Sequence, residues 1–136
     1  MEDRETPRQG LDPATQSERT IRLSPGERIL CQLADLQDGA SRGFDPDDCG
    51  EDRLFAVRRG DLAFVYVNSC PHNRRPLELR KDHFLSRDGS EILCYAHGAH
   101  FRVENGTCVY GPCLGKTLAA VAARVEDGWV IISRNA

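Results

Sequence analysis

Long hydrophobic runs are missing from this sequence: no apolar stretch approaches the roughly 20 residues of a membrane-spanning helix. The chain also lacks the basic start and following apolar stretch of a secretory signal, since residues 1–7 are polar and acidic. An excess of positive charge is absent too, and the formal net charge is −3. We therefore predict a cytoplasmic protein that binds neither membranes nor, as a general property, nucleic acid.

A chain of 136 residues fits a single domain. Residues 1–22 are charged and poor in apolar side chains, which predicts a flexible tail, and the domain is expected over residues 23–136. Helical periodicity is weak except near residues 76–81 and 118–123. Short runs of β-favouring residues, separated by turn signals, instead favour an all-β sandwich or small barrel.

The expected strands are short, and several pair as hairpins. Residues 54–58 and 62–67 form the clearest pair, because only Arg59-Gly60-Asp61 links them. Residues 37–52 are predicted to form a polar, acidic loop. The full set of predicted strands comprises residues 28–33, 54–58, 62–67, 91–94, 99–103, 107–110, 124–126 and 129–132.

The chain has six cysteines, which in a reducing compartment are thiols or metal ligands more often than disulfides. Only two of them have a histidine two or three residues on. They form one box, Cys70-Pro71-His72, and a second, Cys94-Tyr95-Ala96-His97. Each box follows a predicted strand, so two loops held side by side would present two sulfurs and two nitrogens at one point.

Two kinds of metal centre suit this donor set. In a [2Fe–2S] cluster, two thiolates hold one iron and two neutral imidazoles the other, which raises the reduction potential relative to a four-cysteine cluster. A tetrahedral zinc ion also accepts two cysteines and two histidines, although the common zinc order is a cysteine pair followed by a histidine pair. Unrelated cysteines and histidines with this spacing by chance are the third alternative.

The boxes and their surroundings resemble the Rieske family. The first box is followed by the Pro76-Leu77 pair that is common there, and the second continues as Gly98-Ala-His-Phe101, similar to the family's C-x-x-H-G-x-x-F. Residues 106–113, Gly-Thr-Cys-Val-Tyr-Gly-Pro-Cys, with Leu118, resemble the stretch that ends in the proline loop covering the cluster. The resemblance spans residues 28–132.

This resemblance implies stacked antiparallel sheets with a small cluster-binding subdomain at about residues 68–114. It also implies one [2Fe–2S] cluster, with Cys70, His72, Cys94 and His97 as its ligands. Two departures from the family pattern are visible. Arg74 stands where a glycine is common, and the segment between the boxes is longer, which predicts a surface excursion around residues 80–88.

The resemblance also bears on the redox level. In respiratory Rieske proteins a serine and a tyrosine of the second box donate hydrogen bonds toward cluster sulfurs, and an extra cysteine in each box forms a disulfide. Here Ala99 and Phe101 occupy the first two places and Ala96 that of the box-two cysteine, while box one offers only Asn73, Arg74 and Arg75. We therefore expect a low potential, roughly −150 mV.

A low potential suits an electron carrier that is not itself an enzyme. The expected partners are a flavoprotein reductase and a terminal oxygenase, and the carrier is expected to be a monomer. Two alternatives remain. One is the small [2Fe–2S] subunit of a reductase, similar to that of assimilatory nitrite reductase, with the reductase large subunit as partner. The other is an iron–sulfur redox sensor.

Basic residues just past the first box have two interpretations. They form either a collar that steers an acidic partner surface or an ordinary solvated loop. The residues are Arg74, Arg75, Arg80 and Lys81.

The other cysteines and histidines are expected to serve structure. Cys31 is predicted to lie in the core, Cys49 to be an exposed thiol, and Cys113 to pack in the proline loop, with a Cys108–Cys113 disulfide as the weaker alternative. The two spare histidines, His83 and His100, are predicted to lie on the surface or to pack. Gly98, Gly111 and Pro112 are expected to shape and shield the cluster site without ligating it.

Overall fold

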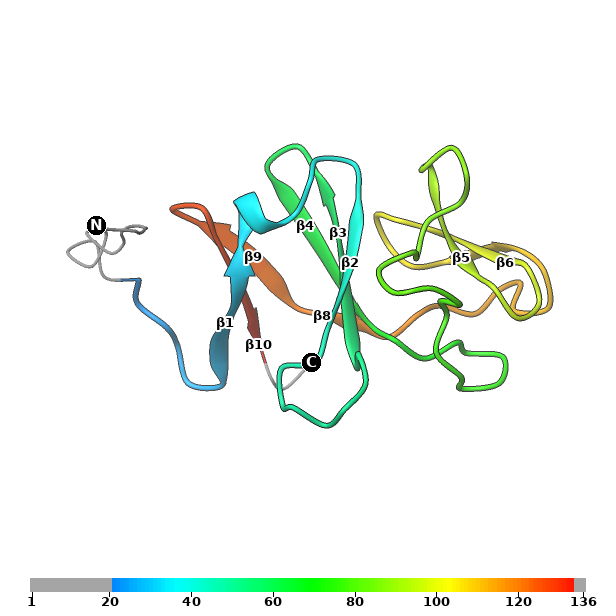
Figure 1. Ribbon diagram of the computed structural model, residues 1–136, viewed down its shortest axis with the longest axis horizontal. Coiled ribbons are helices and arrows are strands. Elements are labelled where there is room, and N and C mark those ends of the chain that lie inside the picture. The colour runs from blue at the N-terminus through cyan, green and yellow to red at the C-terminus, as the bar shows by residue number, and fades with distance from the viewer. Residues whose placement is uncertain (1–20, 134–136) are drawn as a thin grey trace.

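The computed structural model describes residues 21–133, so the tail expected over residues 1–22 lies almost entirely outside the described part. The described chain folds into three antiparallel sheets arranged along the long axis of the molecule (Figure 1). One short 3₁₀ helix, η2 (Leu33–Asp35), accompanies the strands. The all-β prediction is therefore confirmed.

The three sheets differ in size. The first has the order β1 (Glu27–Gln32), β10 (Trp129–Ser133) and β9 (Ala123–Glu126). The second has the order β2 (Ser41–Phe44), β3 (Leu54–Arg59), β4 (Leu62–Val67) and β8 (Ala120–Val121). The third has the order β5 (Glu91–Cys94), β6 (Ala99–Arg102) and β7 (Cys108–Tyr110).

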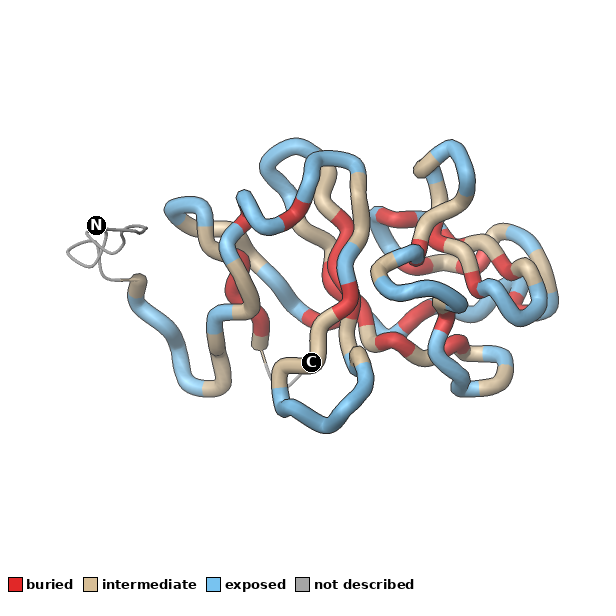
Figure 2. Tube along the Cα trace, in the orientation of Figure 1, coloured by how far each residue is buried: buried red, intermediate tan, exposed pale blue. Residues whose placement is uncertain are grey.

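The β3–β4 hairpin separates two hydrophobic cores, because successive side chains of a strand point to opposite faces of its sheet. Phe55 and Val57 of β3 belong to a core shared with the third sheet, whereas Leu54 and Ala56 belong to a core shared with the first sheet. Figure 2 shows buried segments running through the middle sheet and into the β5–β7 end. The two-residue alternation therefore lets the middle sheet pack against both of the other sheets.

Two strands were missed. The loop predicted over residues 37–52 contains a strand, β2, whose Phe44 pairs with Leu54 of β3. Residues 118–123, where helical periodicity was noted, contain strand β8, because Val121 pairs with Val65. Residues 76–81, the other place with such periodicity, form bends and turns.

The predicted surface excursion over residues 80–88 is also more than a surface feature. Phe84 is completely buried there, and its ring stacks on that of Phe55 with 4.4 Å between centroids. The peptide N–H of Leu93 in β5 donates to the Phe84 carbonyl at 2.9 Å. The excursion thus returns to the core and fastens the third sheet to the middle one.

In the described part of the chain, no helix has the length and apolar character needed to cross a bilayer.

Candidate metal centre

The loop of the first box begins directly after β4 and is anchored by a buried amide. The Asn68 side-chain oxygen accepts from the peptide N–H of Leu77 at 2.9 Å, and its nitrogen donates to the carbonyl of Asp52 at 3.0 Å. Burying this polar side chain is favourable because both ends have partners. Asn68 therefore fixes the start of the box relative to the segment that follows it.

Two backbone hydrogen bonds then join the start of the first-box loop to its end. The peptide N–H of Arg74 donates to the carbonyl of Cys70 at 2.6 Å, and that of Cys70 donates to the carbonyl of Arg75 at 2.9 Å. The loop buries the Cys70 side chain, which is 1% exposed, and leaves His72 exposed. One turn thus directs the thiol inward and the imidazole outward.

The second box repeats this arrangement after β5. Cys94 is completely buried and His97 is exposed. The peptide N–H of Gly98 donates to the Cys94 carbonyl at 2.9 Å, in a turn that needs a φ of +71° at Gly98. The N–H of Tyr95 donates to the carbonyl of Leu77 at 2.8 Å, which ties the second box to the segment after the first.

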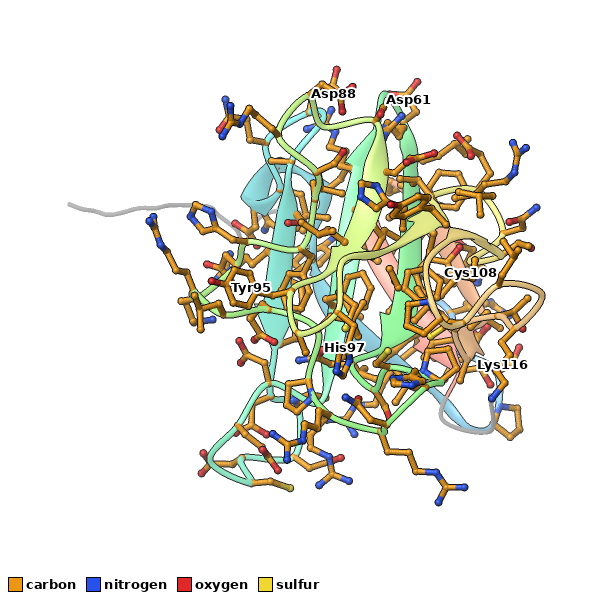
Figure 3. All side chains as sticks on the ribbon, turned by 90° about the vertical axis from the view of Figure 1, so that its right-hand side faces the viewer. Asp61, Asp88, Tyr95, His97, Cys108 and Lys116 are labelled. Atoms are coloured by element: carbon orange, nitrogen blue, oxygen red, sulfur yellow. The ribbon has the colours of Figure 1, made fainter. Side chains whose placement is uncertain are left out.

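The structure brings the four predicted residues together as two pairs. The imidazole rings of His72 and His97 lie 4.8 Å apart between centroids, and the Cys70 thiol is in hydrogen-bonding contact with that of Cys94. Figure 3 looks onto this end of the molecule, where Tyr95 and His97 lie on one loop. The sulfur pair is buried and the imidazole pair faces solvent.

The electrostatics of Cys94 reflect this placement. Burial raises the pKa of its thiol, and the neighbouring Cys70 sulfur raises it further. The peptide N–H groups of Ala96 and His97 donate to the Cys94 sulfur and act in the opposite direction. A sulfur that already receives backbone hydrogen bonds is well prepared to carry negative charge as a metal ligand.

This donor set has the composition that a two-iron cluster requires. Within residues 21–133, no group of three or more histidine, cysteine, aspartate or glutamate side chains gathers closely enough to hold one metal ion. A [2Fe–2S] unit instead distributes its protein ligands as two separate pairs, one on each iron. A sulfur pair beside an imidazole pair has the chemical composition that such a unit requires.

The proline loop, residues 111–116, packs against both boxes. A side chain on Gly111 would place a Cβ 2.8 Å from the Cα of Ala99, so only glycine allows this approach. Cys113 is completely buried, with its Sγ 3.7 Å from that of Cys70. Burial, and then the Cys70 sulfur, raise the pKa of Cys113 to about 12. Packing was predicted for Cys113, but the contact with Cys70 was not.

Cys108 and Cys113 are both free thiols, so the weaker alternative of a disulfide is wrong. The Cys108 thiol instead donates to the carbonyl of Tyr110 at 3.3 Å. As predicted, Cys49 is exposed. Cys31, which was predicted to lie in the core, is only half-buried and packs against the core of the first sheet. Burial raises the pKa of the Cys31 thiol to about 11.

The spare histidines and the basic residues differ in exposure and in their charged partners. His83 is exposed, while His100 packs on β6 with its Nδ1 3.0 Å from a Glu91 carboxylate oxygen. Lys81 pairs with Asp52 and Asp82 at 2.9 and 3.1 Å. Its charge is therefore largely compensated, whereas Arg74 and Arg75 are exposed beside the first box.

Comparison with known proteins gives three results. The sequence model of the Rieske [2Fe-2S] domain matches residues 27–125. Among proteins with curated functions, none matches this sequence significantly. A ferredoxin of Sphingomonas yanoikuyae B1 is similar in structure, with 27% identity and a TM-score of 0.61 over 79% of this chain and 97% of that one.

Two further structures place this likeness in context. One chain comes from a complex of reduced oxygenase and oxidised ferredoxin in carbazole 1,9a-dioxygenase, with 25% identity and a TM-score of 0.63 over 82% of this chain and 95% of that one. The terminal oxygenase of carbazole 1,9a-dioxygenase from Novosphingobium sp. KA1 shares the fold alone. It has 19% identity and a TM-score of 0.60, and the match covers 79% of this chain but only 29% of the oxygenase.

Proposed function

The chain belongs to the Rieske [2Fe–2S] family, and we propose that it is a single-electron carrier between a flavin reductase and a terminal oxygenase. A domain of this family holds one [2Fe–2S] cluster, which supplies one-electron chemistry when bound. Three features of this chain support the proposal: the positions of the proposed ligands, the surface around them and the polarity of the cluster site.

We assign the ligands by their pairing. Cys70 and Cys94 would hold one iron of the cluster, and His72 and His97 would hold the other. The buried contact between the two sulfurs and the exposed contact between the two rings support this assignment. With the domain at residues 23–136, the ligands fall within a cluster-binding subdomain at about residues 68–114.

The carrier role follows from which ligands face solvent. The imidazoles of His72 and His97 are exposed, so a docked partner could approach the histidine side of the site closely while the cysteine sulfurs stay buried. The matched ferredoxins are covered almost to their full length, whereas less than a third of the oxygenase is covered. These coverages favour an electron carrier of the ferredoxin kind. We propose that the carrier is monomeric and does not itself catalyse an organic reaction.

The surface beside the histidines suits an acidic partner. Arg74 and Arg75 carry positive charge next to His72, and the apolar side chains of Tyr95 and Leu114 are 59% and 67% exposed. Positive charge around an apolar contact steers association with a negatively charged surface and leaves the contact itself dry. We therefore propose that this face receives an acidic surface of the oxygenase or of the reductase.

The polarity of the site supports a low potential. Ala99 and Phe101 are completely buried and carry no hydroxyl. A cluster with fewer hydrogen-bond donors gains less stabilisation from an added electron. A potential of roughly −150 mV is expected, and a redox titration that gave a clearly positive value would contradict it.

One experiment tests the centre directly. The protein is purified anaerobically, reduced with dithionite, and examined by EPR together with iron and zinc analysis. Two irons per chain, with a rhombic signal whose average g lies below that of four-cysteine clusters, are expected. One zinc without iron or signal would overturn the proposal. Permanent co-purification with a large reductase would instead favour the subunit alternative.

A further inference from the structure

A third sulfur lies beside the proposed ligand pair. The Sγ of Cys113 is 3.7 Å from the Sγ of Cys70, although the two residues are far apart in the sequence. Both side chains are almost completely inaccessible, with exposures of 0% and 1%. The contact therefore lies in a dry environment, where a hydrogen bond is stronger than in water.

The proline loop holds Cys113 in a fixed position. Its peptide carbonyl accepts from Lys116 at 2.8 Å, and the N–H of Leu114 donates to the carbonyl of Gly111 at 3.2 Å. The close approach of Gly111 to Ala99 presses the start of the loop against the second box. The sulfur thus has little freedom to move away from Cys70.

We propose that the Cys113 thiol donates a hydrogen bond to the Cys70 sulfur and so raises the reduction potential of the cluster that Cys70 holds. This inference rests on the ligand set of the proposed function. A cysteine that ligates iron does so as a thiolate, which has no proton and can only accept. Cys113 must then be the donor in this contact, and it acts as a positioning residue because it reaches the cluster only through Cys70.

The direction of the effect follows from charge. Reduction adds an electron to the cluster and increases the negative charge on its ligand sulfurs. A donor that faces one of those sulfurs stabilises the reduced form more than the oxidised form. Cys113 is therefore a local source of stabilisation in a site where Ala99 and Phe101 provide no hydroxyl donor.

A matched control lies in the same part of the chain. Cys108 is also buried, but its thiol donates to the carbonyl of Tyr110 at 3.3 Å. Removing that thiol should alter packing to a similar extent without changing the hydrogen bonds of Cys70. Three holoproteins are therefore compared with the wild type: Cys113→Ala, Cys113→Ser and Cys108→Ala.

The readouts are the iron content, the EPR spectrum and the reduction potential. Cys113→Ala should make reduction three- to tenfold less favourable, which lowers the potential by about 30 to 59 mV for one electron. Cys113→Ser keeps a donor and should lie closer to the wild type, and Cys108→Ala should not shift. An unchanged potential in Cys113→Ala, or an equal shift in Cys108→Ala, would overturn the inference.

The outcomes separate this inference from the proposed function. A wild type without the two-iron EPR signal would remove the ligand set itself, whereas a normal signal with no response to Cys113→Ala removes only the role of Cys113. Should the alanine variant lose its iron, the Fe–S(Cys) stretching bands of the wild type and of Cys113→Val, which fills the space without a donor, are compared in H2O and D2O. Identical isotope shifts would then contradict the hydrogen bond, and different shifts would support it.

Discussion

The imidazole rings of His72 and His97 meet edge to face, with 4.8 Å between centroids and 85° between planes. Residues 73–93 separate the two boxes, so only the folded β5–β7 end brings these rings together. Both histidines are exposed, whereas Cys70 and Cys94 of the same two boxes are buried. We therefore expect the two histidines to serve one site, so that replacing either of them disrupts that site.

Replacing either ring should release the cluster. We expect His97→Ala to retain less than about one iron per chain, because the proposed cluster needs two imidazoles on one of its irons. His100→Ala is the matched control, since His100 is bound to Glu91 and lies on β6 outside the pair. Iron analysis and visible absorbance check both. Full iron content in His97→Ala would contradict the ligand assignment.

Reversing the charge beside the first box should change the reaction with anions. Arg74→Glu combined with Arg75→Glu should slow reduction of ferricyanide by the reduced protein roughly tenfold at low salt, because attraction becomes repulsion. The difference should shrink as salt screens the charges. Stopped-flow kinetics measure it. Arg87→Glu, next to the Asp88 labelled in Figure 3, changes the net charge by half as much as the double variant. It should change the logarithm of the rate by much less than half as much.

The close approach of Gly111 to Ala99 gives a steric prediction. Gly111→Ala should lower the free energy of unfolding by about 1–3 kcal/mol and speed iron loss, because its Cβ would lie 2.8 Å from the Ala99 Cα. Gly115→Ala shares the positive φ, +90° against +101°, but a Cβ there meets no described atom within 4 Å. Thermal unfolding of the two holoproteins separates the collision from the backbone strain. Equal losses would show that strain alone acts.

Phe84 should be a major contributor to stability. Its ring is completely buried and stacks on Phe55, so Phe84→Ala should reduce the free energy of unfolding by about 3–5 kcal/mol. Leu79→Ala, in the same connection but 63% exposed, should change it by less than about 0.5 kcal/mol. Denaturant titration measures both. A small effect of Phe84→Ala would mean that the connection does not fasten the sheets.

Asp82 gives a prediction about pH. Burial alone would raise its pKa, but the N–H of Gly43 at 2.8 Å and the ammonium of Lys81 together lower it below the ordinary value. Because the folded-state pKa is depressed, the stability it contributes is present above the unfolded value of 3.8 and disappears as the pH falls through the folded value.

The comparison is between the wild type and Asp82→Asn, which tolerates the positive φ of 66° at this position and keeps an acceptor oxygen. We expect Asp82→Asn to be about 1 kcal/mol less stable at neutral pH, a modest value because the carboxylate is partly exposed. The gap should close as the pH falls below the folded-state pKa of Asp82. A gap that persisted in acid would show that the charge of Asp82 is not responsible.

Local patterns in the sequence were enough for most of the fold. The β3–β4 hairpin was predicted because apolar and β-branched residues flank a short turn, and both strands form with nearly the predicted ends. Strand β2 was missed because Ser41-Arg42-Gly43 has no apolar alternation. It pairs with β3 only because Gly43 allows close packing against the Asp52 side chain, which no local pattern reveals.

The candidate site, too, could be predicted only in part from the sequence. The spacing of each box shows which cysteine and histidine share a loop. The resemblance to Rieske proteins predicts that the two loops lie close together. The contact of Cys113 with Cys70 could not be predicted, because it depends on how far the proline loop reaches over the first box. The compensation of Lys81 by Asp52 was likewise missed, since their proximity arises only in the folded chain.

The alternation along β3 and β4 has a consequence for how this protein can diverge over time. Phe55, Val57 and Tyr66 face the ligand loops, while Ala56 and Val65 face the sheet of β1, β9 and β10, and the two cores share no residue. Substitutions that retune the redox end or fit it to a new partner need no compensation on the other side of the hairpin. The β1–β9–β10 side can therefore be inherited unchanged while the loops beyond β4 are selected for new roles.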